Sequence, residues 1–430
     1  MKKIVKALLV TLVIIAITFF AFSCTVKHTP TDEEASKSVF EERFDLTNQV
    51  LEFIKENFYD DLDYDMADLY AAYGLVSSLG EYNYIYAPEE RLGITADGKG
   101  FGLLIKNSAY NEHIVDFILP GSPFLTPCDG KTVARGDELY AINDQRMSGI
   151  VSSTYSAYLA TLPSDEPVKF TIKRGEEMFD VSYQKIDFSF PYCIYINDLP
   201  GVPSNFGYIC LRTFDNSTNV LNEFKSAVRS FNSDGNRALI LDLRSNGGGS
   251  ANVLGQIASM LVGHDVPAGE VLFEIHYAKQ DRSNFVYYTP MENKIDVPVY
   301  VLCNGGTASA SEALIGTMKA HGTLTALIGQ TTVGKGVAQN GFTTYQKGEK
   351  GILTDKGLDE DGNEVDIGTY LMQIIVGKYY IYDPAAEGGK YCIHGNPFTP
   401  DILISGVNPI TPDYSDDLYI KAAIEHYNNG

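Results

Sequence analysis

The chain has 430 residues, more than one ordinary domain needs and enough for two or three. Hydrophobic residues make up 44% of the sequence, which is sufficient for sizeable cores. The formal net charge of -22 argues against a nucleic-acid-binding protein, because phosphate backbones are bound by clustered Lys and Arg. Neither CxxC nor a Cys/His metal-binding spacing occurs, so we expect no metal, no other cofactor and no disulfide framework.

The first 24 residues have the pattern of an export signal. Three lysines precede an apolar stretch over 7–22, which is short for a membrane span of roughly 20 residues. Cys24 follows this stretch, as in a bacterial lipoprotein signal, in which the cysteine becomes diacylated. An ordinary signal peptide and an uncleaved anchor stay open, and all three interpretations export the protein. We therefore expect a lipoprotein anchored to a membrane of a bacterial cell envelope, with polar residues 25–38 as a flexible tether.

Residues 39–95 indicate a small helical domain. Apolar residues recur there at helical spacing, namely at Phe44, Val50, Leu51, Ile54 and Phe58. A second helix is expected over about 65–79. The tyrosine-rich segment SLGEYNYIYAPEE then ends this domain as a loop.

Residues 96–188 change to short strands separated by turns. GKGFGLLI, HIVDFILPGSPF and ARGDELYAINDQRM each predict a turn and a strand, and VKFTIKRGEEMFDVSYQ predicts a hairpin that turns near Gly175. With the short helix expected in VSSTYSAYLATLP, this order resembles a PDZ domain. The resemblance implies that a peptide carboxyl terminus adds as a strand and is captured by backbone N–H groups at Lys99, Gly100, Phe101 and Gly102. The alternative is a structural β-domain without a free groove.

Residues 189–430 alternate strands and helices. Strands are expected in FGYICLRTF, ALILDLR and PVYVLCN, and helices in VLNEFKSAVRSF, ANVLGQIASMLV and SEALIGTMKAHG. ALILDLR is a continuous apolar run, which is typical of a strand buried on both faces. This alternation predicts an α/β layered core. Residues 345–369 are polar and glycine-rich, and we expect them to form a surface hairpin or loop.

Ser309 is the first candidate for chemistry. It follows an apolar strand and the turn at 304–306, and it opens a helix, where unpaired N–H groups favour developing negative charge. The alternative role is structural, because Ser309 and Glu312 have the spacing of a capping box. Ser311 is the competing nucleophile.

Lys335 lies between two glycines in a stretch with little other charge. A lysine can act as a base only when its amine is neutral, and burial lowers its pKa toward that condition. Serine–lysine pairs are a known form of nucleophilic catalysis. Gln339, four residues later, could orient the amine by a hydrogen bond. A solvated turn lysine is the alternative.

A glycine-rich loop follows the strand ALILDLR. Its residues Ser245 to Gly249 could point backbone N–H groups at an oxyanion, which gives a large stabilisation in acyl transfer. The loop matches neither a P-loop nor GxGxxG.

The segments DLRSNGGG (242–249), TASASE (307–312) and GKGVAQ (334–339), in this order, resemble the C-terminal processing peptidases, or tail-specific proteases. This is a family of serine peptidases with a PDZ domain, a Ser–Lys catalytic pair and an α/β layered, crotonase-like core. The resemblance covers nearly the whole chain from about residue 40, although the insertion at 345–369 departs from the family pattern. It implies roles that the residues alone leave open: Ser309 as nucleophile, Lys335 as general base, Gln339 as its orienter, and an oxyanion hole from Ala310 and either Gly247 or Gly248.

The expected function is an exported serine endopeptidase that binds proteins or peptides with free C-termini and cleaves near that tail. One alternative keeps Ser309 but uses a histidine base, with His264, His276 and His321 available, as in tricorn-like hydrolases. The other is a catalytically silent, lipid-anchored protein that binds peptides through its PDZ groove. The sequence does not indicate an oligomeric state.

Overall fold

The computed structural model describes residues 45–57, 64–86, 99–107, 112–147, 158–159, 161–187, 191–262, 266–277, 282–287, 294–342, 354–358, 364–369 and 371–429. The expected export signal with Cys24, the tether at 25–38 and His264 lie outside these residues. The chain divides into two compact units, residues 1–74 and 75–430, which are described separately. Within the described ranges, none of the helices is long and apolar enough to cross a bilayer.

The N-terminal part of the chain contains the two helices that the spacing predicts. They are α3 (Asp45–Asn57) in the first unit and α4 (Tyr64–Ser77), whose last residues lie in the second unit. A turn at 78–83 and the short strand β1 (Tyr84–Tyr86) follow. The tyrosine-rich segment is therefore more than a loop, because part of it pairs with a sheet.

Residues 99–187 form an antiparallel sheet with its own core. The order of its main strands is β3-β4-β5-β7-β8. These strands are β3 (Leu103–Asn107), β4 (His113–Ile118), β5 (Glu138–Ile142), β7 (Val168–Arg174) and β8 (Glu177–Tyr183), with β6 (Gln145–Arg146) beside β5 and a separate pair of β2 (Lys99–Gly100) and β9 (Ile186–Asp187). The expected hairpin turns at Gly175, whose φ of +60° suits glycine. Phe124 and Phe170 pack edge to face in the core of this sheet.

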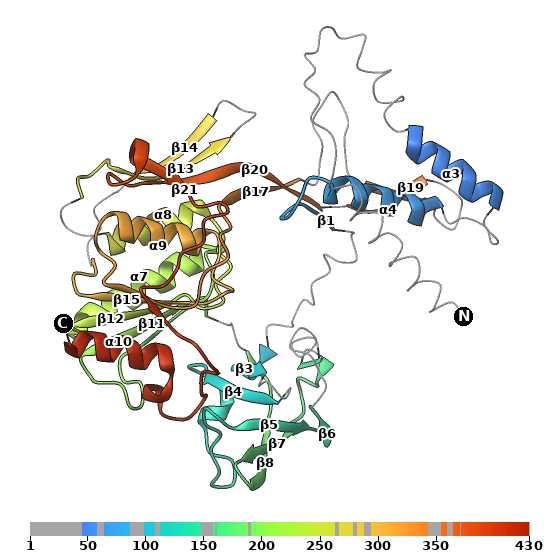
Figure 1. Cartoon of the computed structure of the whole chain (residues 1–430). Coiled ribbons are helices and arrows are strands. Elements are labelled where there is room, and N and C mark those ends of the chain that lie inside the picture. Colours follow the sequence, from blue (N-terminus) through green and yellow to red (C-terminus); the bar gives the residue numbers. More distant parts are fainter. Residues whose placement is uncertain are drawn as a thin grey trace. The chain divides into compact units, whose positions relative to one another are not determined.

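The central sheet has the order β10-β11-β12-β15-β16-β22, parallel from β11 onward and antiparallel at β10. Its strands are β10 (Cys193–Ile196), β11 (Phe206–Leu211), β12 (Ala238–Asp242), β15 (Val299–Cys303), β16 (Ala326–Gly329) and β22 (Ile402–Leu403). Helices α7 (Thr218–Ser233), α8 (Ala251–Leu261) and α9 (Ala310–Ala320) cover one face, and α10 (Leu418–Asn429) covers the other (Figure 1). The predicted α/β layering is confirmed.

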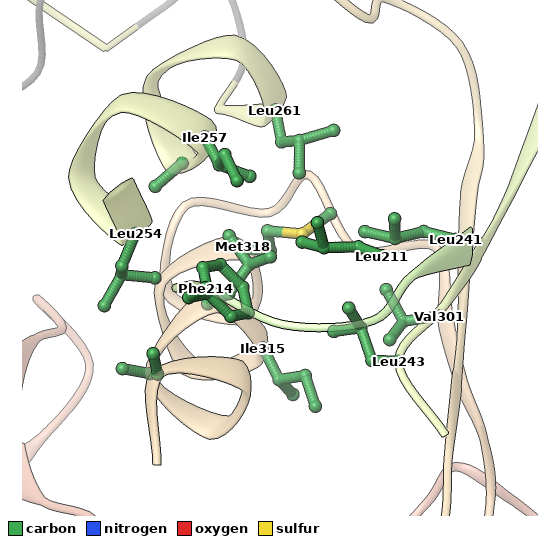
Figure 2. Packing of buried hydrophobic residues seen from close by; sticks show 14 of the residues in the cluster. Leu211, Phe214, Leu241, Leu243, Leu254, Ile257, Leu261, Val301, Ile315 and Met318 are labelled. Carbon is green, nitrogen blue, oxygen red and sulfur yellow. The ribbon is translucent and has the colours of Figure 1, made fainter. Parts of the chain in front are cut away.

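The inner strands β12, β15 and β16 are buried on both faces, because alternate residues enter different cores. Leu239 and Leu241 of β12 point to the helices α7–α9, whereas Ala238 and Ile240 point to α10. Figure 2 shows the first of these cores, where leucines and a valine of the strands meet α8 and α9. The residues labelled there are Leu211, Phe214, Leu241, Leu243, Leu254, Ile257, Leu261, Val301, Ile315 and Met318. This packing holds the start of α9 against the ends of β12 and β15.

A second sheet, which the sequence did not predict, is organised around the long strand β20 (Leu371–Tyr382). Its other strands are β1, β13 (Val271–Tyr277), β14 (Arg282–Tyr287), β17 (Val337–Phe342) and β21 (Lys390–Cys392). The insertion expected at 345–369 contains the antiparallel pair β18 (Thr354–Leu358) and β19 (Glu364–Thr369). Because β1 and β17 both pair with β20, the turn at 78–83 is brought to the beginning of β17.

Candidate active site

Two loops meet at the carboxyl ends of the neighbouring parallel strands β12 and β15. Asp242 ends β12 and pairs with Leu302 of β15, and the Leu243 N–H donates to the Leu302 carbonyl at 2.9 Å. Ligand sites in open α/β sheets favour this edge. The glycine-rich loop at 243–250 and the turn at 304–309 are therefore placed side by side by the sheet itself.

Asn304 joins the two loops. Its Oδ1 accepts the N–H groups of Ser245 at 2.8 Å and Gly306 at 3.0 Å, and its Nδ2 donates to Ser245 Oγ at 3.1 Å. The hydroxyl of Thr307 adds a bond of 2.9 Å to the Leu243 carbonyl. Beyond the ends of β12 and β15, these side-chain hydrogen bonds take the place of the backbone hydrogen bonds between the strands. They hold both loops in one conformation.

Ser309 lies at the turn into α9 with φ +59° and ψ −118°, a conformation rare for a residue with a side chain. It is buried but keeps 7% of its surface exposed. The competing Ser311 is fully buried, and its hydroxyl donates to the Asn246 carbonyl at 2.9 Å. Of the two serines, Ser309 has the geometry of a nucleophile on a sharp strand-to-helix turn.

The two predicted oxyanion glycines differ in what their N–H groups do. The Gly248 N–H donates to Asn246 Oδ1 at 2.9 Å. Gly248 also lies so close to Ser309 that an added Cβ would come within 2.7 Å of the serine Cβ. For the Gly247 N–H, and for that of Ala310 in the first turn of α9, the described residues offer no acceptor. The geometry thus favours Gly247 over Gly248 as the partner of Ala310.

Lys335 and Gln339 are in direct contact. The Lys335 ammonium donates to Gln339 Oε1 at 2.6 Å, and Gln339 Nε2 donates to the backbone carbonyl of Tyr82 at 2.6 Å. Burial lowers the pKa of Lys335 below the ordinary lysine value. A lysine with this surrounding is closer to a working base than a solvated turn lysine is.

Glu312 connects the serine to the lysine, a role that sequence reasoning missed. Its fully buried carboxylate accepts the N–H groups of Ser309 (3.0 Å) and Lys335 (2.8 Å) on the same oxygen, Oε2. The other oxygen accepts the Gly334 N–H at 2.7 Å and the Thr332 hydroxyl at 2.6 Å. Two donors on one oxygen keep the Ser309 and Lys335 amide nitrogens within about 6 Å of each other. The Ser-x-x-Glu spacing was visible, but it indicated only a helix cap.

Arg244, at the start of the glycine-rich loop, is held by two buried carboxylates. Its guanidinium contacts both oxygens of Asp242 and donates to Asp417 Oδ2 at 2.9 Å. Asp242 also accepts the Tyr208 hydroxyl at 2.7 Å. Arg135, from the antiparallel sheet at 99–187, reaches the same region and lies 3.8 Å from Asp417 Oδ2. No local pattern pointed to Asp417, which lies 173 residues from Arg244 in the sequence.

Of the histidines considered as alternative bases, the structure describes His276 and His321, and neither makes a described hydrogen bond to Ser309. His321 is the C-cap of α9, at the opposite end of the helix from Ser309, and a rise of about 1.5 Å per residue puts the two about 18 Å apart. His276 lies on β13, where its Nδ1 is 3.6 Å from Glu274 Oε1. A histidine not considered before, His394, contacts Tyr82, with ring centroids 6.5 Å apart.

The segment predicted to bind peptide, Lys99 to Gly102, directly precedes β3, and its first two residues form β2, which pairs with β9. Phe101 is buried in the core of its sheet, and its carbonyl accepts the Ser122 hydroxyl at 2.6 Å. The Gly102 carbonyl accepts the Leu119 N–H at 2.9 Å. β3 pairs with β4 on one side, and within the described residues its other edge has no partner strand. An edge of this kind can accept an added peptide strand.

Comparisons with known proteins point to one family of peptidases. Residues 205–369 match the model of peptidase family S41. The carboxy-terminal processing protease CtpA of Bacillus subtilis is 26% identical over 336 residues, which cover 76% of this chain and 68% of the relative. CtpB of the same organism is 23% identical over 350 residues, covering 77% and 66%. A solved Bacteroides fragilis structure assigned to the S41 proteases has the same fold, with a TM-score of 0.56, 14% identity and coverage of 94% of this chain and 99% of that one. The chain therefore contains a domain of peptidase family S41.

Proposed function

We propose that the chain is a serine endopeptidase that cleaves proteins near their C-terminal tails. The observation that carries the proposal is the Glu312 carboxylate, which accepts the backbone N–H groups of both Ser309 and Lys335, while the Lys335 amine donates to Gln339. The relatives named carboxy-terminal processing proteases support the class of substrate.

The mechanism follows from the roles of these groups. Ser309 Oγ attacks the scissile carbonyl carbon while the neutral Lys335 amine takes the hydroxyl proton. The N–H groups of Ala310 and Gly247 stabilise the oxyanion of the tetrahedral intermediate. Lys335 then gives its proton to the leaving amine, which yields an acyl-enzyme and a free amino terminus. Water attacks the ester, with Lys335 as base, and releases the acid and Ser309.

The remaining features complete the proposal. The free edge of β3 after Lys99–Gly102 would receive the substrate's C-terminal segment as an added strand, as in a PDZ domain. Export through the N-terminal signal and a lipid anchor at Cys24 would place the enzyme on a membrane of the cell envelope. For the Ser–His alternative, His321 lies at the opposite end of α9 from Ser309, and His276 contacts Glu274.

The test is proteolysis of an unstructured protein with an apolar C-terminus by the chain without its signal, compared with its Ser309→Ala form. Ser226→Ala, which removes an exposed hydroxyl from α7, is the matched control. Cleavage by the parent and the control, and none by Ser309→Ala, supports the proposal. Equal cleavage by all three would leave Ser309 as a helix cap and refute it. If none of them cleaves but the chain binds the peptide tail, the catalytically silent binding protein becomes the better interpretation.

A further inference from the structure

The Lys335–Gln339 pair is completed by a residue outside the segment that matches family S41. Tyr82 lies in the turn at 78–83, more than a hundred residues before residue 205, where that match begins. We propose that Tyr82 is a positioning residue for the Lys335 amine, with its ring as one wall of the space around the amine and its backbone carbonyl as the anchor of Gln339. This inference rests on the proposed function, in which Lys335 is the general base.

The contacts form a closed loop of three residues. The Lys335 Nζ lies 5.0 Å from the centre of the Tyr82 ring, within range of a cation–π contact. Lys335 donates to Gln339 Oε1, and Gln339 Nε2 donates to the Tyr82 carbonyl, both at 2.6 Å. One residue thus fixes both members of the pair, the amine through its ring and the amide through its carbonyl.

The turn is built to hold Tyr82 in this place. Tyr82 has a φ of +67°, a strained conformation for a residue with a side chain. The buried Asn83 compensates, since its Nδ2 lies within 3.3 Å of the carbonyls of Leu79, Gly80 and Glu81 and donates to them. Its Oδ1 accepts the Ile375 N–H of β20 at 2.9 Å. Hydrogen bonds of the neighbouring Asn83 to the turn and to β20 therefore stabilise the strained conformation of Tyr82.

The ring has two opposite effects on the lysine. Covering the amine excludes water and favours its neutral form, whereas the ring face attracts the charged form. Burial lowers the pKa of Lys335, so we expect exclusion of water to be the larger effect. Burial first, then Glu81, Glu312 and Tyr84, raise the pKa of Tyr82 itself, so its hydroxyl stays neutral and the ring supplies no counter-charge. The imidazole ring of His394 also lies against the Tyr82 ring.

The experiment measures the Lys335 amine directly, in the full chain carrying Ser309→Ala so that proteolysis does not interfere. A small amine-reactive reagent is applied over a range of pH, and modification of Lys335 is followed by mass spectrometry. We expect Tyr82→Ala to move the midpoint to higher pH by about one unit, because water reaches the amine. Tyr82→Phe keeps the ring and should titrate as the parent does. Tyr70→Ala, at an exposed tyrosine of α4, is the matched control.

A second measurement uses the active chain and records kcat/KM against pH. Tyr82→Ala should lose about tenfold below the midpoint of the acid limb and recover at higher pH, with Tyr82→Phe within about twofold of the parent. A loss that is uniform over pH, or an unmoved titration midpoint in Tyr82→Ala, would overturn the proposal. If the parent cleaves nothing, the proposed function fails while the amine titration still decides the role of Tyr82.

Discussion

Buried carboxylates occur at two places around the candidate active site, and different groups compensate their charges at each place. Asp242 and Asp417, near the start of the glycine-rich loop, are paired with the guanidinium of Arg244. Among the described residues, the donors to Glu312 are three backbone N–H groups and one hydroxyl, which belong to Ser309, Gly334, Lys335 and Thr332.

The difference follows from the segments that Arg244 and Glu312 each hold together. A guanidinium can join distant segments, and Arg244 ties β12 to the start of α10. Hydrogen bonds from backbone N–H groups fix the main chain over a few ångströms. Glu312 binds the backbone of Ser309 and that of Lys335, so it fixes the positions of these two loops relative to each other. We infer that the arginine network supports stability and that Glu312 supports catalysis, a distinction that substitutions can break or sharpen.

Arg244→Met should give the largest effect on stability. It leaves the buried Asp242 without its cation and Asp417 with Arg135 alone, and breaking a buried ion pair from one side costs about 3–5 kcal/mol. Urea denaturation would measure the loss. The double variant with Asp417→Asn should recover part of it, because one of the two charges is then removed. Loss of activity without loss of stability would contradict the assignment of this network to stability.

Glu312→Gln should lower activity more than stability. The side chain keeps its shape, but its new NH₂ group faces two donors, whichever oxygen it replaces. Displacing the Ser309 or Lys335 backbone by a fraction of an ångström should lower kcat/KM by about 100-fold. Glu223→Gln is a control outside the site, since Glu223 also accepts two backbone N–H groups, those of Tyr192 and Cys193. Equal activity losses in both variants would remove the special role of Glu312.

Lys335 is a third case, a half-buried cation whose ammonium is bound by an amide. Its pKa is lowered by burial, so the neutral amine appears at lower pH than in a free lysine. We expect kcat/KM to rise with pH along one acid limb whose midpoint lies below the lysine value of about 10.5. Gln339→Leu removes the amide oxygen that favours the charged amine, and it should move this midpoint to lower pH. A limb that does not respond to Gln339→Leu would argue against Lys335 as the base.

On stability, Lys335→Met should have the smallest effect of these variants, a gain of less than about 1 kcal/mol at neutral pH, since solvent still screens the half-buried amine. The sign follows from linkage. The folded-state pKa lies below the unfolded one, so the cost of the charged amine is present at low pH and disappears as pH rises through the unfolded value. The gain should therefore be absent above about pH 10.5, which thermal unfolding at two pH values would show.

Local patterns predicted the elements that present the site. The apolar run of β12, the glycines after it and the helix starting near Ser309 are all visible in the sequence, because strand, turn and helix starts depend on neighbouring residues. The sheet around β20 was not predicted, since its six strands come from segments as far apart as 84–86 and 390–392, and pairing between distant segments leaves no local signal.

By itself, the sequence determined which residue types carry the chemistry: a serine at a helix start, a lysine between glycines with a glutamine four residues later, and a glycine-rich loop. Only the tertiary structure decided what surrounds them, because burial and hydrogen-bond partners depend on segments far apart in the chain. Glu312 changed from a helix cap to the link between Ser309 and Lys335. Tyr82 reached Lys335 only because β1 and β17 share the strand β20.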